Sequence, residues 1–156
     1  MSAPGADEYQ ELLLRSYQTL TFGEVFFHAW ADGESDPARC EKLRLIEQIV
    51  GRTAARLHPF IPPSAPEPQT ELLPAAAGRS AAQQGWDDAI KGLHEINAQV
   101  LGTFIRCREA APDPHHPVFV QLVGHALAIT AFTDLEVFGL GDVSLAVLDR
   151  YLKDNP

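Results

Sequence analysis

The stretch that decides the fold is VFVQLVGHALAITAFTDLEVFG, from Val118 to Gly139, the most apolar part of the chain. One stripe of it, with spacings of three and four, consists of Val118, Leu122, His125, Ile129, Phe132 and Glu136. Such spacings place residues on one face of an α-helix, so a helix is predicted here. His125 and Glu136 are polar, and burying such groups is costly unless they are paired, hydrogen-bonded or metal-bound. They are therefore the first functional clue.

The composition predicts one globular domain. The chain has 156 residues, enough to bury a core, and 46% of them are hydrophobic. The net charge of -9 disfavours nucleic acid and anionic lipid as partners, because both need a surplus of Lys and Arg. The chain opens without a secretory signal pattern. Cys40 and Cys107 lack a ligand-like spacing and are expected to be buried free thiols, so we expect a cytoplasmic protein.

The apolar stretch also raises the question of a membrane span, because its length is sufficient. Four polar residues interrupt it, at a high cost in lipid: Gln121, His125, Asp134 and Glu136. We therefore expect a buried helix of a bundle and no membrane partner.

Helical periodicity extends through most of the chain and predicts an all-α fold of four long helices and a short fifth one. Ser35-Asp36-Pro37 marks the start of the second helix, because Asp favours the N-cap and Pro the first helical position. The short link before it makes helices one and two antiparallel neighbours. The helices are expected at residues 8–32, 37–57, from 80 or 86 to 109, from 117 to 139 and from 142 or 144 onward. The last of them is expected to seal one end of the bundle.

Two segments have no helical pattern. Residues 1–7 are small and polar and are expected to be flexible. Residues 58–79 contain six of the 12 prolines and no periodic apolar face. A connection this long needs a topological reason, so we expect an extended crossover that returns the chain to the other end of the bundle. The single domain then covers residues 1–156.

Carboxylates interrupt the apolar stripes of the first two helices as well. Glu24 and Glu47 differ in height by about 5 Å across the predicted hairpin, so both are expected to face the core near one level. His94, on the third helix, approaches the same layer. Two buried carboxylates resist ionisation unless a metal ion, a shared proton or a basic partner lies between them. A functionless buried pair and a metal or ligand site both fit this pattern.

This order of elements resembles the ferritin-like superfamily: two helices, a long connection, two more helices and a short tail, with Glu24 and Glu47 in the first pair. The resemblance implies a four-helix bundle whose carboxylates and Glu-x-x-His pairs bind two metal ions. Here Val50 stands three residues after Glu47 and Gly139 three after Glu136, so neither Glu-x-x-His pair is intact. His125 and Glu136 are about 16 Å apart along one helix and cannot share a metal ion.

The sequence therefore predicts a degenerate ferritin-like bundle that holds one metal ion or a small ligand in its core. The metal-ligand candidates are Glu24, Glu47, His94 and His125, with iron, manganese or zinc as the ion. The alternatives are a non-catalytic interaction module and, third, a di-metal oxidoreductase, and whether the chain is an enzyme stays open.

The first helix also carries an aromatic row that one neighbouring helix cannot cover: Phe22, Phe26, Phe27 and Trp30. Large apolar faces left without a neighbour are typical of interfaces between subunits. We therefore expect a homodimer through the first helix.

Overall fold

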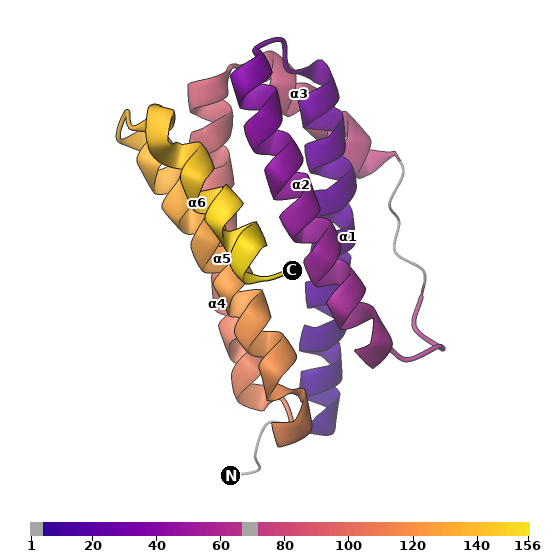
Figure 1. Cartoon of the computed structure of the whole chain (residues 1–156). Coiled ribbons are helices and arrows are strands. Elements are labelled where there is room, and N and C mark those ends of the chain that lie inside the picture. Colours follow the sequence, from indigo (N-terminus) through magenta and orange to yellow (C-terminus); the bar gives the residue numbers. More distant parts are fainter. Residues whose placement is uncertain (1–4, 67–71) are drawn as a thin grey trace.

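The computed structural model describes residues 5–66 and 72–156, and every regular element in these ranges is helical (Figure 1). The prediction of an all-α protein is confirmed. The α-helices are α1 (Ala6–Gly33), α2 (Pro37–Leu57), α3 (Leu73–Gln84), α4 (Trp86–Ala110), α5 (His116–Val137) and α6 (Gly141–Asp154), with short 3-10 helices η1 (His58–Phe60) and η2 (Asp113–His115).

The four long helices surround a common core. α1 lies against α2 and α4, and α5 contacts the same two helices from the other side. In Figure 1, α1 and α5 run in one direction, and α2 and α4 run in the other. The core consists mainly of large apolar side chains from all four helices, including the fully buried Trp30, Ile46, Phe104 and Phe132. Because α2 and α4 run in the same direction, the chain must cross the length of the bundle between them.

The start of α2 follows from the sequence as predicted. The carboxylate of Asp36 accepts a hydrogen bond of 3.0 Å from the backbone N–H of Arg39, and Pro37 is the first helical residue. The guanidinium of Arg39 lies 5.3 Å from the centroid of the Trp86 ring, at the start of α4. α4 therefore begins at the end of the bundle where α2 begins, as the predicted crossover requires.

The crossover itself differs from the prediction. Residues 67–71 lie outside the described part of the chain, but the segment from Leu73 onward forms α3 instead of an extended connection. α3 packs on α1 through small residues. A Cβ atom on Gly78 would lie 2.3 Å from the carbonyl oxygen of Phe26, so only glycine permits this approach. The buried face of α3 consists of small residues, Pro74, Gly78 and Ala81, and therefore lacks the periodic large apolar side chains from which the other helices were predicted.

Both ends of the chain also need correction. Residues 1–4 lie outside the described part, whereas Ala6 and Asp7, expected to be flexible, form the first turn of α1. α6 was expected to seal one end of the bundle. It lies instead along the side of α5 and also contacts α2, with Leu148 and Leu152 buried between them (Figure 1).

α5 is the predicted central helix. By length and composition alone, the segment Asp113–Val137 is apolar enough to cross a membrane, but 56% of its most apolar window is buried inside the protein. Its buried residues include Phe119, Leu122 and Phe132, which the core of the bundle surrounds. The apolar character of α5 is thus explained by packing on α2, α4 and α6.

The aromatic row of α1 has a neighbour within the same chain. α3 lies along this side of α1, and Phe27 and Trp30 are buried. Phe26 is partly buried against the core, and Phe22 keeps 41% of its surface exposed. α3 therefore covers most of the aromatic surface from which the dimer was predicted, and the homodimer stays a prediction.

Candidate functional site

Glu24 and Glu47 meet on the outside of the bundle. Both line a shallow groove on the outer face of α1 and α2, where Glu24 is exposed and Glu47 is half-buried. The prediction that they face the core is wrong. Opposite Glu24 stands Gly51, whose Cβ would lie 3.1 Å from Glu24 Oε1. The absence of a side chain at Gly51 lets the long Glu24 side chain lie across α2 and reach water.

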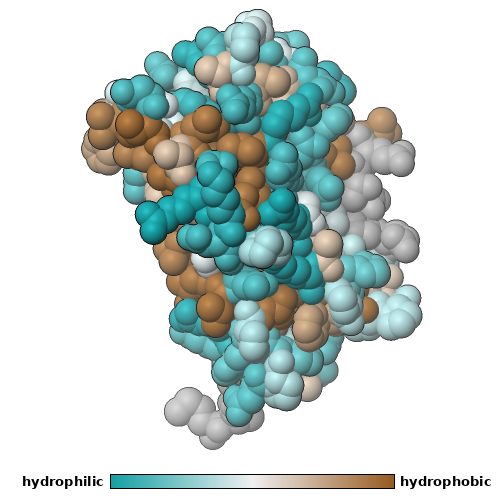
Figure 2. Space-filling model, viewed as in Figure 1, coloured by the Kyte–Doolittle hydropathy of each residue, from teal (hydrophilic) through white to brown (hydrophobic). Residues whose placement is uncertain are grey.

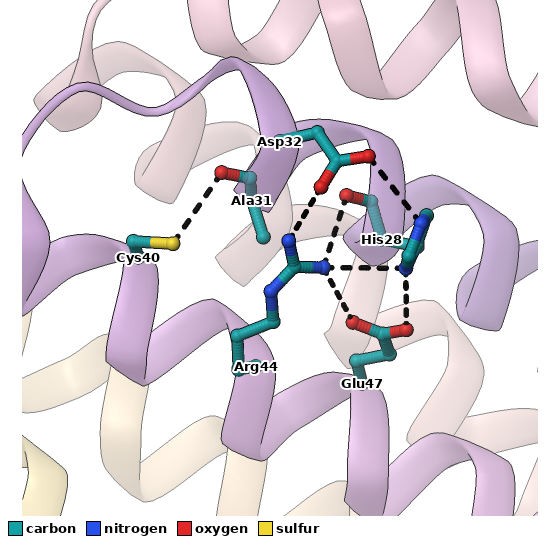
Figure 3. A network of polar contacts seen from close by, with 6 residues as sticks. All are labelled: His28, Ala31, Asp32, Cys40, Arg44 and Glu47. Atoms are coloured by element: carbon teal, nitrogen blue, oxygen red, sulfur yellow. Dashed lines mark hydrogen bonds and ion pairs between the residues drawn. The ribbon is translucent and has the colours of Figure 1, made fainter.

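Arg44 and His28 contact two acids at this groove, Glu47 and Asp32 (Figure 3). Arg44 Nη1 donates to Glu47 Oε2 at 3.0 Å, and its Nη2 donates to Asp32 Oδ1. His28 Nδ1 lies 2.8 Å from Glu47 Oε1. The hydrogen bond from Arg44 lowers the pKa of Asp32 below its usual value, and the same bond raises the pKa of Arg44. Glu47 thus has a basic partner and Glu24 is exposed to solvent, so neither carboxylate requires a metal ion or a shared proton.

His94 lies elsewhere, on the face of α4 that meets α5. Its Nδ1 is 2.9 Å from Thr133 Oγ1 and 3.5 Å from Asp134 Oδ1, and its side chain is partly exposed. The structure does not bring His94 together with Glu24 and Glu47 in one layer. Within residues 5–66 and 72–156, no three His, Cys, Asp or Glu side chains form a group that could hold a metal ion.

Glu136 is a partner of a buried ion pair. Its side chain is only 7% exposed, and its Oε1 accepts from Lys42 Nζ at 2.5 Å and from Ser144 Oγ at 2.7 Å. Its Oε2 accepts from Trp86 Nε1 at 2.9 Å. Burial alone would raise the pKa of Glu136, but these hydrogen bonds outweigh it and lower the pKa. The carboxylate therefore joins α5 to α2, α4 and α6.

His125 is the predicted candidate that does lie in the core. It is 3% exposed, and its Nδ1 lies 2.8 Å from Thr53 Oγ1 on α2. The ring of Phe104 meets it edge to face at 6.0 Å between centroids. Desolvation by burial lowers the pKa of His125 to about 4, so the imidazole is neutral near pH 7.

His125 lines an apolar pocket of about 370 Å³ between α1, α3, α4 and α5. This volume is within the range of small-molecule sites in proteins. The apolar walls come from Leu20, Phe22, Phe26, Phe27, Val50, Ala77, Ala81, Leu93, Ile96, Val100, Phe104 and Ile129. No Asp, Glu, Lys or Arg is among the described residues that line it.

Asn97 on α4 is the second deeply buried polar residue that lines this pocket. It is 5% exposed, and its Nδ2 donates to the Ala126 carbonyl at 3.0 Å and to Thr130 Oγ1 at 2.8 Å. Asn97 and His125 thus bring polar groups from α4 and α5 to the wall of one pocket. The candidate residues chosen from the sequence did not include Asn97. A carboxamide among Ile, Val and Phe side chains was the signal that could have identified it.

Comparisons of this chain with protein-family models, with curated proteins and with solved structures found no match. We therefore infer a function from the geometry of the pocket and of its polar groups.

Proposed function

We propose that this protein is a degenerate ferritin-like bundle that binds a small, mainly apolar molecule in the pocket between α1, α3, α4 and α5. The observation that carries the proposal is the pocket of about 370 Å³, which has apolar walls and two deeply buried polar residues, His125 and Asn97. The pocket opens to solvent beside the exposed Phe22 and Ile96, and concave apolar pockets of this size with a few polar groups are typical of small-molecule sites.

The ferritin-like part of the proposal is supported by the order of the helices. α2 and α4 run in the same direction, and α1 and α5 each contact both of them (Figure 1). This arrangement needs a long connection between the second and third long helices, which residues 58–85 supply. α3, formed within that connection, adds a wall to the pocket through Ala77 and Ala81.

A single metal ion stays a prediction with little geometric support, because its four candidate ligands are divided between an outer groove, the α4–α5 face and the core. Elemental analysis of protein purified without chelator tests it. Iron, manganese or zinc at one ion per chain would favour the metal site, and its absence would favour the apolar ligand.

Gly92 offers a sharp test of the pocket. It lines the pocket, and a Cβ added there would meet no atom within 4 Å. A Gly92→Leu side chain would therefore occupy the pocket without a clash at its first atom. Gly102, also on α4, is exposed and equally open around its Cβ but does not line the pocket, so Gly102→Leu is the matched control.

The experiment titrates wild-type protein and both variants with the neutral fluorescent probe N-phenyl-1-naphthylamine. We expect saturable binding to wild type and to Gly102→Leu, and at least a tenfold weaker affinity for Gly92→Leu. Both variants should fold, because leucine is a better helix former than glycine by roughly 1 kcal/mol. Equal affinity of all three proteins would contradict the proposal.

The second candidate function, an interaction module, is favoured by an exposed apolar cluster where α5 passes into α6. Val137, Phe138, Leu140 and Val143 are all exposed, Phe138 by 77%. Figure 2 shows hydrophobic residues gathered at this end of the molecule. Exposed apolar patches are common at protein interfaces.

Light scattering of wild type, Phe138→Ser and Phe22→Ser distinguishes this surface from the dimer predicted through α1. Loss of a dimer only in Phe22→Ser would support the predicted α1 interface, and loss only in Phe138→Ser would support the α5–α6 cluster. A monomer in all three would oppose a homodimer through either surface.

A further inference from the structure

We propose that the pocket selects neutral alcohols and phenols, through two hydrogen-bond acceptors in its wall; this inference rests on the proposed ligand-binding function. The acceptors are His125 Nε2 and Asn97 Oδ1. Both residues line the pocket, and neither of these two atoms has a hydrogen-bond partner among the described residues.

The hydrogen bonds around Thr53 fix the tautomer of His125. Thr53 Oγ1 lies 2.9 Å from the carbonyl oxygen of Ile49, which can only accept, so the single hydroxyl proton of Thr53 is directed there. Thr53 Oγ1 must then accept from His125, whose Nδ1 carries the proton, at 2.8 Å. In a neutral imidazole the other nitrogen, Nε2, holds a lone pair and acts as an acceptor.

The contacts of Asn97 fix the orientation of its amide in the same way. Both protons of Nδ2 are used, one by the Ala126 carbonyl and one by Thr130 Oγ1. Thr130 Oγ1 in turn donates to the Ala126 carbonyl at 2.9 Å, so it accepts from Asn97. The remaining polar atom of Asn97 is Oδ1, which can only accept.

Two acceptors in the wall of an apolar pocket determine which ligands fit. A hydroxyl group donates its proton to either acceptor and satisfies it. An ether of the same shape leaves both acceptors unpaired, and unpaired buried polar groups are what makes such sites discriminate strongly. A carboxylate would bring negative charge toward two lone pairs. It would also be desolvated without a cation, since no Lys or Arg is among the described lining residues.

The test compares three ligands with one ring system: 2-naphthol, 2-methoxynaphthalene and 2-naphthoate at pH 7, by calorimetric titration of the wild-type protein. We expect 2-naphthol to bind about tenfold more tightly than the methyl ether, because one hydrogen bond separates them. We expect 2-naphthoate to bind more weakly than both. Equal affinity for the alcohol and the ether, or tightest binding of the carboxylate, would overturn the inference.

The Asn97→Leu variant then assigns the preference to the pocket. It removes one acceptor, so the ratio of the 2-naphthol and ether affinities should fall. Asn97 also joins α4 to α5, so its replacement can lower stability. The readout is therefore the ratio of the affinities for 2-naphthol and its methyl ether, measured on the folded variant. If the variant does not fold, the comparison of the three ligands on the wild-type protein still tests the inference. An unchanged ratio in folded Asn97→Leu would contradict the role of Asn97.

The two proposals fail in different ways. If N-phenyl-1-naphthylamine binds and Gly92→Leu blocks it, while 2-naphthol and its ether bind equally, the pocket is a ligand site without the proposed selectivity. If neither the probe nor any naphthalene ligand binds, both proposals are wrong.

Discussion

The outer groove of α1 and α2 and the interior of the bundle both carry acids and histidines, but they use them differently. In the groove, His28, Asp32, Arg44 and Glu47 contact one another at the edge of the solvent. In the interior, within the described part of the chain, Glu136 accepts from three donors and His125 is hydrogen-bonded through one nitrogen. The same residue types therefore contribute little to the free energy of unfolding at the surface and much more when they are buried.

The buried ion pair should give the largest effect. Lys42→Met leaves the carboxylate of Glu136 without its cation at a site that is 7% exposed. Breaking a buried pair on one side costs about 3–5 kcal/mol, so we expect the free energy of unfolding to fall by this order. Urea denaturation at pH 7 measures it.

The double variant Lys42→Met with Glu136→Gln is the control, because it removes both charges and leaves the Gln carbonyl to accept from Trp86 and Ser144. It should recover more than half of the loss. A single variant as stable as the wild type would show that Glu136 is not held in a buried ion pair.

The second effect comes from His125 and depends on pH. Its pKa is 6.5 in the unfolded chain and about 4 in the folded one, so the unfolded state binds the additional proton between these values. Stability is therefore fully present above pH 6.5, falls as the pH drops from 6.5 to 4, and levels off below 4. At about 1.4 kcal/mol per pKa unit, the loss is on the order of 3 kcal/mol.

Replacing His125 with Gln removes this titration. Urea denaturation of both proteins at pH 7, 5.5 and 4 should show the wild type losing more stability than His125→Gln, because all other groups titrate in both. Parallel loss of stability in the two proteins would show that His125 takes up its proton as easily in the fold as in the unfolded chain.

The smallest effect is expected in the outer groove. Glu47→Gln removes one partner of Arg44 and His28 in a solvent-accessible network, where an ion pair contributes about 0–1 kcal/mol and is screened by salt. Thermal melting at low and high salt measures it, with Glu24→Gln as the control from the same groove. If Glu47→Gln lowers the free energy of unfolding by more than about 2 kcal/mol, the groove network contributes as much as a buried ion pair. The two regions would then not differ in the way proposed.

Most of the fold could be predicted because its signals are local. The cap at Asp36 and the proline at position 37 determine the start of α2, and the stripe around Phe132 determines the buried face of α5. α3 could not be found in this way. Its contact with α1 depends on the absence of a side chain at Gly78, which a count of large apolar residues does not detect.

The candidate site was predicted less well, because the direction in which a side chain points depends on the residues that face it from the neighbouring helix. Glu24 shares a helical stripe with Leu13 and Leu20 but reaches solvent across Gly51 on another helix. His125 was predicted correctly as a core residue, because it lies in the middle of the most apolar stripe. The pocket beside it arises from how four helices fit together, which no single stretch of sequence encodes.

The most direct test of the central claim is to locate the bound probe by NMR. Intermolecular NOEs from N-phenyl-1-naphthylamine should reach the methyl groups of Ala81, Val100 and Ile129, which line the pocket from three different helices. The exposed methyl groups of Val137 and Val143 serve as the internal control. We expect NOEs to the first set, which place the ligand in the pocket. NOEs confined to the second set would place it on the exposed α5–α6 cluster and contradict the proposed binding site.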